Sequence, residues 1–241
     1  MSEWIKNIKT QIKPYDLPWL FLFFVIPVFP SLISSAIVLI ILSLIVDYKS
    51  CKFNFSENKL LVLPVLLYFA YMLGLLFTDT DGMKAIVAER KLSLFIFPVI
   101  FLFKRNFDLS FRKYLWNSFF AGLLLYILLS LLGAIEGYSR SRDVNSFFSS
   151  AFSYDLHPSY SALYLCIAIL YMLFNFIDYS NHYTLKNKVL LVITIIIFSA
   201  VVFLLSSKAG IISFILVIIS SLIYFGIKHK KLYYLIVFSV L

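Results

Sequence analysis

Three basic residues have the type and setting to bind an anion. Arg140 and Arg142 lie near the start of residues 136–165, the one long polar interruption in an otherwise hydrophobic sequence, and Lys208 lies in a shorter polar stretch. A guanidinium group binds phosphate through two parallel hydrogen bonds, and an ammonium group adds a compact charge. The plainer interpretation is that the two arginines are solvated loop charges and that Lys208 anchors to lipid headgroups.

A helix is predicted to begin at the end of the polar stretch. Proline suits the first turn of a helix, because its missing N–H would have no partner there, so Pro158 is the expected start and Asp155 or Ser153 the expected cap. The spacing i, i+3, i+4, i+7 then puts four side chains on one helix face. They are His157, Tyr160, Ser161 and Tyr164.

Three residues of this face join the candidate site. His157 is a candidate for binding and, more weakly, for catalysis, while Tyr160 and Tyr164 are candidates for binding. Each also has a plainer explanation, because a histidine beside a helix start can cap the helix or contact headgroups. Tyr160 then serves as an interfacial aromatic residue, and Tyr164 as a packing residue.

The composition is that of an integral membrane protein. The chain of 241 residues is 62% hydrophobic and 14% charged, and its mean hydropathy is +0.95. Apolar runs reach the roughly 20 residues that a helix needs to cross a bilayer, whereas strands of a membrane barrel alternate over about 10 residues. We therefore expect an all-α, polytopic transmembrane helical bundle that forms a single domain over residues 1–241.

The apolar runs give the expected spans. Residues 17–46 are too many for one span and barely enough for two, with Pro27 and Pro30 near the middle as a natural break. One long, kinked helix is the alternative. The other expected spans are a short one ending at residue 103 and residues 60–77, 114–135, 158–177, 189–205 and 210–227, with a final run from residue 232.

The short span ending at Phe103 brings charged residues to the membrane. Residues 92–103 cannot cross about 30 Å at 1.5 Å per residue, so upstream residues must take part. Glu89, Arg90 and Lys91 are then placed near the membrane surface, as secondary candidates for contacting substrate. Pairing with one another and snorkelling to headgroups are the plainer roles.

The basic residues set the expected orientation. Cytoplasmic loops are enriched in Lys and Arg. If the basic cluster at residues 104–113 lies inside, most of the 21 Lys and Arg fall on the cytoplasmic side, and both ends of residues 17–46 lie there. We therefore expect a cytoplasmic amino terminus, two short spans in that run, and about eight complete spans followed by a truncated ninth.

This topology places the candidate residues on the outer face. Helices that begin at Pro158 and Gly210 both point their amino ends outward, where free N–H groups carry partial positive charge. If Arg140, Arg142 and Lys208 converge beside them, they form a site for a polyanion. On an outer membrane face without ATP, we expect that polyanion to be the pyrophosphate of a polyprenyl-linked glycan.

Several short motifs together resemble a family of bacterial membrane enzymes. In order, they are Arg90-Lys91-Leu92-Ser93-Leu94 leading to Phe97-Pro98, an outer loop with arginine, His157-Pro158-Ser159-Tyr160, and Ser206-Ser207-Lys208-Ala209-Gly210 opening a span. This order is similar to that of the O-antigen ligase and O-antigen polymerase family over roughly residues 89–227. The resemblance implies a multi-pass glycosyltransferase of the bacterial inner membrane. Such an enzyme moves a glycan from undecaprenyl pyrophosphate onto a lipid or glycan hydroxyl, without a metal ion or other cofactor.

The chain departs from this family at two points. Family members usually carry arginine where Lys208 stands, and lysine keeps the charge but loses the planar fork. In the family, a later outer loop carries a histidine regarded as the general base, and residues 1–241 contain no such loop. We therefore expect either the amino-terminal part of an O-antigen ligase-like fold or a chain that lacks part of the catalytic apparatus.

The sequence favours neither a metal site nor a nucleic-acid partner, and it leaves two rival functions open. The three histidines do not cluster in the expected topology, so no metal site is expected, and the net charge of +9 is explained by the loops, so no nucleic-acid partner is expected. A flippase for lipid-linked oligosaccharide, or a transporter of another solute, is the main alternative; a scaffold subunit is the third. The span interiors from residue 60 to 77 and from 114 onward lack the buried charges typical of ion-coupled carriers, which favours chemistry at the outer surface.

Overall fold

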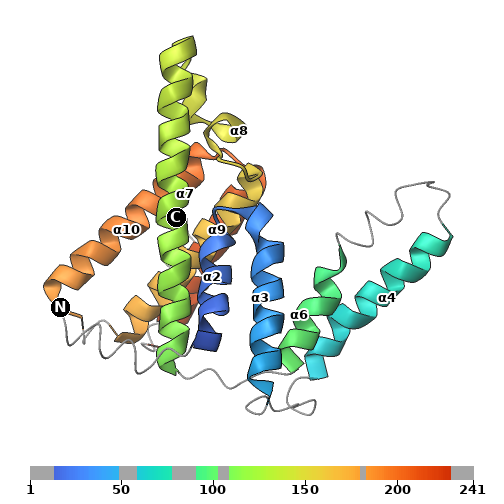
Figure 1. The fold of residues 1–241 in the computed structure, drawn as a ribbon. Helices are drawn as coiled ribbons and strands as arrows, with labels where there is room; N and C mark the ends of the chain where they lie inside the picture. The colour runs from blue at the N-terminus through green and yellow to red at the C-terminus, as the bar shows by residue number, and fades with distance from the viewer. Residues whose placement is uncertain (1–13, 49–58, 78–90, 103–108, 180–182, 229–241) are drawn as a thin grey trace. The chain divides into compact units, whose positions relative to one another are not determined.

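A computed structural model describes residues 14–48, 59–77, 91–102, 109–179 and 183–228 of the chain. All regular secondary structure in these described ranges is helical, which confirms the all-α prediction (Figure 1). Backbone contacts divide the chain into two compact units. The first comprises Met1–Trp19 and Ser34–Lys113, and the second comprises Leu20–Ile33 and Tyr114–Leu241.

Four helices are long and apolar enough to cross a membrane. They are α7 (Leu109–Ser141), α9 (Pro158–Tyr179), α10 (Leu185–Leu204) and α11 (Lys208–Lys228). Four further apolar helices in the described ranges have only 10–17 residues: Pro14–Val25, Pro30–Val46, Lys59–Leu75 and Ser93–Leu102. The structure thus supports a membrane protein with four long spans, and the expected count of eight is not reached by helices of full length. Helices of 10–17 residues rise about 15–26 Å, which is less than the roughly 30 Å of the hydrocarbon core.

The first apolar run forms two helices, as the prolines indicate. Helix α2 (Leu17–Val25) ends before Pro27, and a 3-10 turn, η2 (Pro30–Leu32), leads into α3 (Ile33–Val46). Proline has no backbone N–H to donate to the preceding turn, so it stops a helix that enters from its amino-terminal side. The break confirms the prediction of two helices in residues 17–46 and excludes the alternative of one long, kinked helix.

The first unit contains a helical hairpin with aromatic packing. Helix α4 (Val62–Leu76), preceded by the 3-10 turn η4 (Lys59–Leu61), packs against α6 (Ser93–Leu102). The Phe95 ring lies 5.7 Å from that of Tyr68 and 6.1 Å from that of Phe69. The ammonium group of Lys91 lies 5.0 Å from the centre of the Tyr71 ring, which accounts for its position by a cation–π contact. Glu89 and Arg90 lie outside the described residues.

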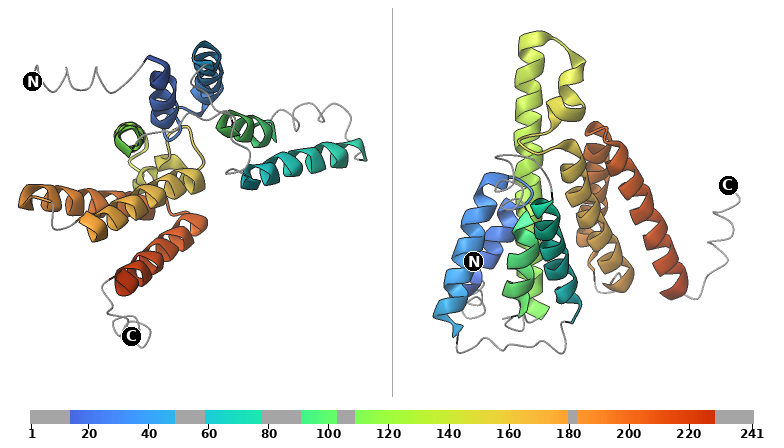
Figure 2. Two further views of the ribbon diagram at one scale, coloured as in Figure 1. Left: turned by 90° about the horizontal axis from the view of Figure 1, so that it is seen from below. Right: turned by 90° about the vertical axis from the view of Figure 1, so that its right-hand side faces the viewer.

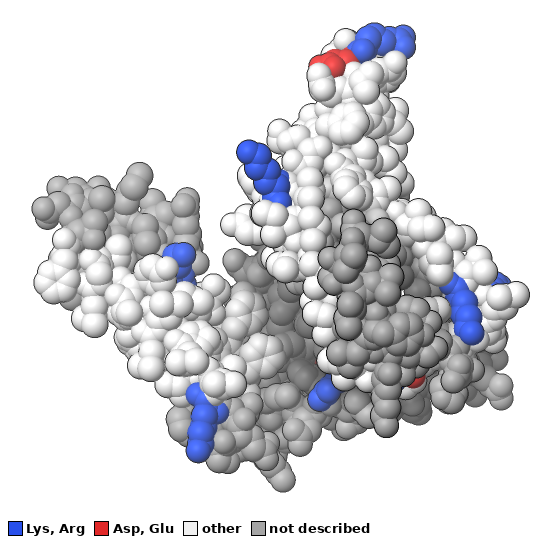
Figure 3. All heavy atoms as spheres, turned by 180° about the vertical axis from the view of Figure 1, so that it is seen from behind, with Lys and Arg blue, Asp and Glu red and all other residues white. Residues whose placement is uncertain are grey.

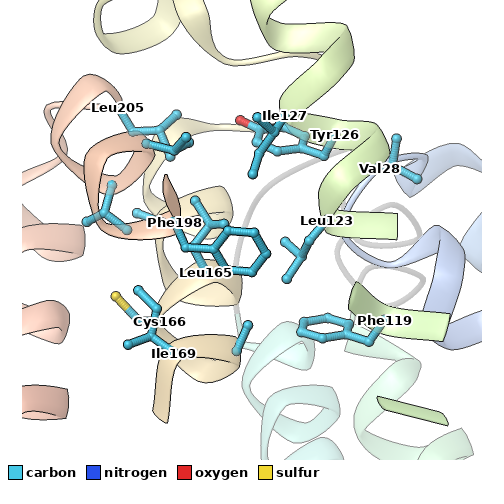
Figure 4. Packing of buried hydrophobic residues seen from close by; sticks show 14 of the residues in the cluster. Val28, Phe119, Leu123, Tyr126, Ile127, Leu165, Cys166, Ile169, Phe198 and Leu205 are labelled. Carbon is cyan, nitrogen blue, oxygen red and sulfur yellow. The ribbon is translucent and has the colours of Figure 1, made fainter. Parts of the chain in front are cut away.

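The second unit is built on a core shared by α7, α9, α10 and α11. Figure 4 shows buried side chains of α7, α9 and α10 pointing toward one another, and Val217 of α11 belongs to the same cluster. At one place α7 and α9 stack the rings of Trp116 and Tyr171, whose centres are 3.9 Å apart. Residues of α2 close the cluster on another side of α7, where Ser118 donates a hydrogen bond to the Leu20 carbonyl at 2.7 Å. The core includes Val28, Phe119, Leu123, Tyr126, Leu165, Ile169 and Phe198.

Helix α7 continues past the predicted end of its span. Its 33 residues rise about 50 Å, whereas the hydrocarbon core is about 30 Å thick. The extra turns include Glu136 and Arg140, whose side chains form an ion pair four residues apart. Such a pair favours continued helix, so the polar tip of α7 was wrongly predicted as loop.

The long helices alternate in direction, so their ends gather in two groups. One side of the second unit holds the carboxyl-terminal ends of α7 and α10 and the amino-terminal ends of α9 and α11 (Figures 1 and 2). We call this side the serine end, because Ser153, Ser159 and Ser207 lie there. The opposite side holds Asp178, Tyr224 and Lys228, and we call it the aspartate end.

Candidate functional site

The start of α9 is capped by His157. Pro158 is the first helical residue, as predicted, and Nδ1 of His157 accepts a hydrogen bond from the Ser159 backbone N–H at 3.3 Å. The expected caps are wrong, because Asp155 makes no such bond and the Ser153 hydroxyl instead donates to the Leu156 carbonyl at 2.5 Å. The imidazole takes the role that a serine or aspartate oxygen usually takes at this position.

The start of α11 is capped by Ser207. Ser206 has a positive φ of 47° and turns the chain, so that α11 begins at Lys208 rather than at Gly210. The Ser207 hydroxyl accepts a hydrogen bond from the Gly210 backbone N–H at 3.3 Å. A serine oxygen at this position satisfies one of the amide groups that have no partner within a helix.

The starts of α9 and α11 lie side by side. The hydroxyls of Ser159 and Ser207 are hydrogen-bonded at 2.9 Å. A Cβ placed on Gly210 would lie 2.4 Å from the Cβ of Ala162, so only glycine permits this approach of the two backbones. The buried Cys166 thiol contacts the Gly210 carbonyl at 3.8 Å. Both partial positive charges of the helix starts therefore fall in one small region.

A chain of buried hydroxyls joins this region to α7. The Tyr126 hydroxyl lies 3.0 Å from that of Ser153, which in turn lies 3.5 Å from that of Ser161. One turn further along α7, the Ser130 hydroxyl accepts the Tyr154 backbone N–H at 3.3 Å. These bonds fix residues 153–157 against the bundle. Ser130 carries no distinctive sequence signal, whereas Ser159 and Ser207 fall within the two short motifs of the sequence, which assign neither serine a role of its own.

The two arginines lie apart from the helix starts. The Arg140 guanidinium is paired with Glu136 at 2.5 Å, and its side chain is 78% exposed. Arg142 follows the helix with a positive φ of 58° and is exposed. The end of α7 that carries them projects beyond the first turns of α9 and α11 (Figures 1 and 2). No contact among the described residues therefore supports the expected convergence of Arg140, Arg142 and Lys208.

The other candidate residues lie nearer to one another. Lys208 follows Ser207 directly and is exposed, and His157 stands two residues before Ser159, the partner of Ser207. The rings of His157 and Tyr160 are 6.1 Å apart, and Tyr160 is 59% exposed. Tyr164 is half-buried, with its ring edge-on to Phe119 at 6.2 Å, which fits a packing role.

The aspartate end has the opposite character. Asp178, near the end of α9, accepts a hydrogen bond from the Tyr224 hydroxyl at 2.8 Å and forms an ion pair with Lys228 on α11. The Tyr224 ring also packs on Phe174, with ring centres 4.6 Å apart. The charges of Asp178 and Lys228 are thus matched within the protein.

The described basic side chains form no single patch on the face in Figure 3, where they stand as separate blue groups, one of them against acidic atoms. No group of three or more His, Cys, Asp or Glu side chains suited to a metal ion occurs in the described part of the chain.

Comparison of the sequence with family models and with curated proteins, and of the fold with solved structures, finds no match.

Proposed function

We propose that the protein is a membrane glycosyltransferase of the O-antigen ligase or polymerase type. It transfers a glycan from undecaprenyl pyrophosphate to a lipid or glycan acceptor at the outer face of the bacterial inner membrane. One observation carries this proposal: the segments His157–Tyr160 and Ser206–Gly210, which resemble two motifs of that family, meet through the Ser159–Ser207 hydrogen bond although they are 48 residues apart. The two motifs are separate in the sequence, and neither motif by itself implies their contact in space.

The chemistry of this meeting point suits a pyrophosphate. Two helix starts direct backbone N–H groups and partial positive charge toward the same side, and an anion is stabilised at such a position. Lys208 adds a full charge in the first turn of α11 and has no ion pair with another described residue. The site would therefore hold the diphosphate of the donor, with Arg140 and Arg142 on the longer α7 tip reaching the more distant glycan.

The long helices favour chemistry at an end over passage through the middle. Between their terminal charged residues, α7, α9, α10 and α11 contain no Asp, Glu, Lys or Arg over residues 114–135, 158–177, 189–204 and 209–227. Carriers coupled to ions usually place such residues near mid-membrane. A flippase that moves the same donor is the competing function that a transfer assay must separate.

The membrane orientation is part of the proposal. Arg112, Lys113, Lys186, Lys188 and Lys228 lie at or near the ends of α7, α10 and α11 that face away from the serine end, and basic residues favour the cytoplasmic side. The serine end then faces outward and the amino terminus lies in the cytoplasm. The short helix pairs α2–α3 and α4–α6 rise less than the thickness of the hydrocarbon core, so about eight spans in all would require the bilayer to thin around them.

The transfer step breaks the bond between the anomeric carbon and the pyrophosphate oxygen. The electron pair of this bond stays on the pyrophosphate, where Lys208 and the helix starts stabilise the growing negative charge. The acceptor oxygen forms the new bond to the anomeric carbon and gives its proton to a base. Undecaprenyl pyrophosphate is the product that leaves.

A reconstituted assay tests this function. The full-length protein in liposomes receives an undecaprenyl-pyrophosphate-linked oligosaccharide and an acceptor lipid, and both the glycosylated acceptor and released undecaprenyl pyrophosphate are measured. We expect both products to form in equal amounts. Movement of the donor between leaflets without either product would identify a flippase and overturn the proposal.

A further inference from the structure

The segment between α8 (Ser149–Phe152) and α9 lies well below the tip of α7. After the tip, the chain runs back along α7 through the 3-10 turn η5 (Val144–Phe147) and α8 (Figure 1). Two hydrogen bonds set its depth, from the Tyr154 N–H to Ser130 at 3.3 Å and between Tyr126 and Ser153 at 3.0 Å. Ser130 precedes Ser141, the last residue of α7, by about 16 Å along the helix axis.

This depth lies within the apolar stretch of α7. The stretch runs from residue 114 to residue 135, between Lys113 and Glu136. It rises about 33 Å, close to the thickness of the hydrocarbon core. Ser130 lies about 9 Å before Glu136 along the axis. Residues 153–157, at the level of Ser130, are thus placed below the outer limit of the hydrocarbon.

The chemistry of residues 153–157 does not suit hydrocarbon. They are not helical, and backbone of this kind persists at membrane depth only where protein or water satisfies it. The Ser130 hydroxyl of α7 satisfies the Tyr154 N–H, and the segment's own Ser153 hydroxyl satisfies the Leu156 carbonyl. On the other side, Asp155 and His157 are exposed, and Asp155 has a positive φ of 50°. An ionised carboxylate facing lipid there would be costly.

We propose that residues 153–157 form a re-entrant segment that dips into the outer half of the bilayer with water in contact with Asp155 and His157. The buried hydroxyls hold its inner side, and water from the outer face reaches its other side. Helices α9 and α11 then begin below the membrane surface, in a hydrated setting. This inference depends on the membrane position of α7 and not on any catalytic activity.

Three single cysteines on the full chain test the proposal. In a background with Cys51→Ser and Cys166→Ala, Arg140→Cys marks the tip of α7, His157→Cys marks the re-entrant segment, and Leu128→Cys marks the lipid side of α7. Leu128 is 53% exposed and lies within about one turn of Ser130, so it is matched in depth to the segment. Asp155→Cys serves as a second probe of the segment.

Two measurements are made on each variant in liposomes. The rate of reaction with a charged, membrane-impermeant thiol reagent reports contact with water. Quenching of a small uncharged fluorophore on the cysteine, by lipids with a nitroxide on the upper acyl chain, reports depth. The fluorophore is attached in detergent before reconstitution, so that Leu128→Cys is labelled as well.

We expect position 157 to be both accessible to water and as deep in the bilayer as position 128. The cysteine at 157 should react with the charged reagent as fast as that at 140 and at least about tenfold faster than that at 128, because charged groups avoid hydrocarbon. Its fluorophore should be quenched as strongly as that at 128 and clearly more than that at 140. The cysteine at 155 should behave like that at 157.

Three results would overturn the proposal. If position 157 matches 140 in both measurements, the segment lies above the membrane surface. If it matches 128 in both, water does not reach it. If 140 and 128 are quenched alike, α7 does not sit in the bilayer as its sequence indicates. None of these results bears on glycan transfer, so failure here and failure of the proposed function are distinguishable.

Discussion

The two ends of the α9–α11 pair are joined by opposite kinds of contact. At the serine end, two neutral hydroxyls and a glycine bring the helices together, and Lys208 carries a charge without an ion-pair partner among the described residues. At the aspartate end, Asp178 binds both Tyr224 and Lys228. The same pair of helices is therefore closed by neutral packing at one end and by matched charges at the other.

The contacts at the serine end leave positive charge available to bind a ligand, whereas the contacts at the aspartate end only hold the two helices together. Charges that are matched inside a protein have little left to offer a ligand, whereas helix starts beside a lone ammonium group attract an anion. A neutral contact at the serine end keeps the helix starts close without using up their charge. Variants of the two ends should therefore change different properties, and the following predictions run from the largest expected effect to the smallest.

Gly210→Leu should have the largest effect. Its Cβ would lie 2.4 Å from that of Ala162, so α9 and α11 must separate. Overpacking of this kind costs about 3 kcal/mol of folding free energy, which should appear as a large loss of thermal stability in detergent. Gly133→Ala is the matched control, because nothing lies within 4 Å of its added Cβ. Equal stability of the two variants would contradict the close approach at the serine end.

Lys208→Ala should lower the rate of glycan transfer without lowering the stability of the protein. Removing one charge that stabilises the leaving pyrophosphate should lower the transfer rate about 100-fold. Lys208→Arg should retain most of the activity, because arginine keeps the charge and adds a fork. Both variants should melt near the wild-type temperature. Transfer that is unchanged in Lys208→Ala would remove Lys208 from the site.

Arg142→Ala should weaken donor binding by a smaller factor. Arg142 follows the tip of α7, which projects beyond the first turns of α9 and α11, so a contact with the donor falls on its outer part and is partly screened by water and salt. The Michaelis constant for the donor should rise about threefold to tenfold, as expected for the loss of one exposed charge contact. Membrane insertion, measured by extraction and protease protection, should not change. An unaltered Michaelis constant would assign Arg142 to the solvated loop.

Ser207→Ala should lower stability by a modest amount. The change removes the cap of α11 and its bond to Ser159, at a cost of about 1 kcal/mol. Ser139→Ala, which removes an exposed hydroxyl on α7 bonded only within its own helix, should cost less. Unfolding by denaturing detergent measures both. Equal losses would show that the contact between the helix starts contributes nothing beyond an ordinary serine.

Asp178→Asn should have the smallest effect. The side chains of Lys228 and Asp178 are 36% and 31% exposed, and ion pairs that are open to solvent contribute little. We expect a slight fall in melting temperature that disappears at high salt, with glycan transfer unchanged. Loss of transfer without loss of stability would move the functional site toward the aspartate end.

Local signals in the sequence predicted the helix boundaries well where proline occurs. Pro158 begins α9, and the break near Pro27 and Pro30 separates α2 from α3, because proline fixes the backbone whatever surrounds it. Ser206 and Ser207 turn the chain into α11, which begins two residues before the predicted Gly210. These signals act over a few residues and need no knowledge of tertiary contacts.

Tertiary contacts and helix lengths were harder to predict. Arg140 was placed in a loop, although the Glu136 four residues earlier favours a longer helix. The shorter apolar helices fall below the length of a full span, since apolar composition does not determine where a helix stops. The Ser159–Ser207 contact joins residues 48 positions apart, and two serines among many carry no sign of it.

Binding of undecaprenyl pyrophosphate to the reconstituted protein tests most directly whether the serine end holds the donor. The measurement compares wild type with Lys208→Ala and Lys228→Ala, two variants that remove one charge each from opposite ends of α11. We predict that Lys208→Ala weakens binding about tenfold or more, as loss of a charge contact to phosphate should, while Lys228→Ala binds like wild type. Equal affinities of the two variants, or weaker binding by Lys228→Ala, would contradict the account.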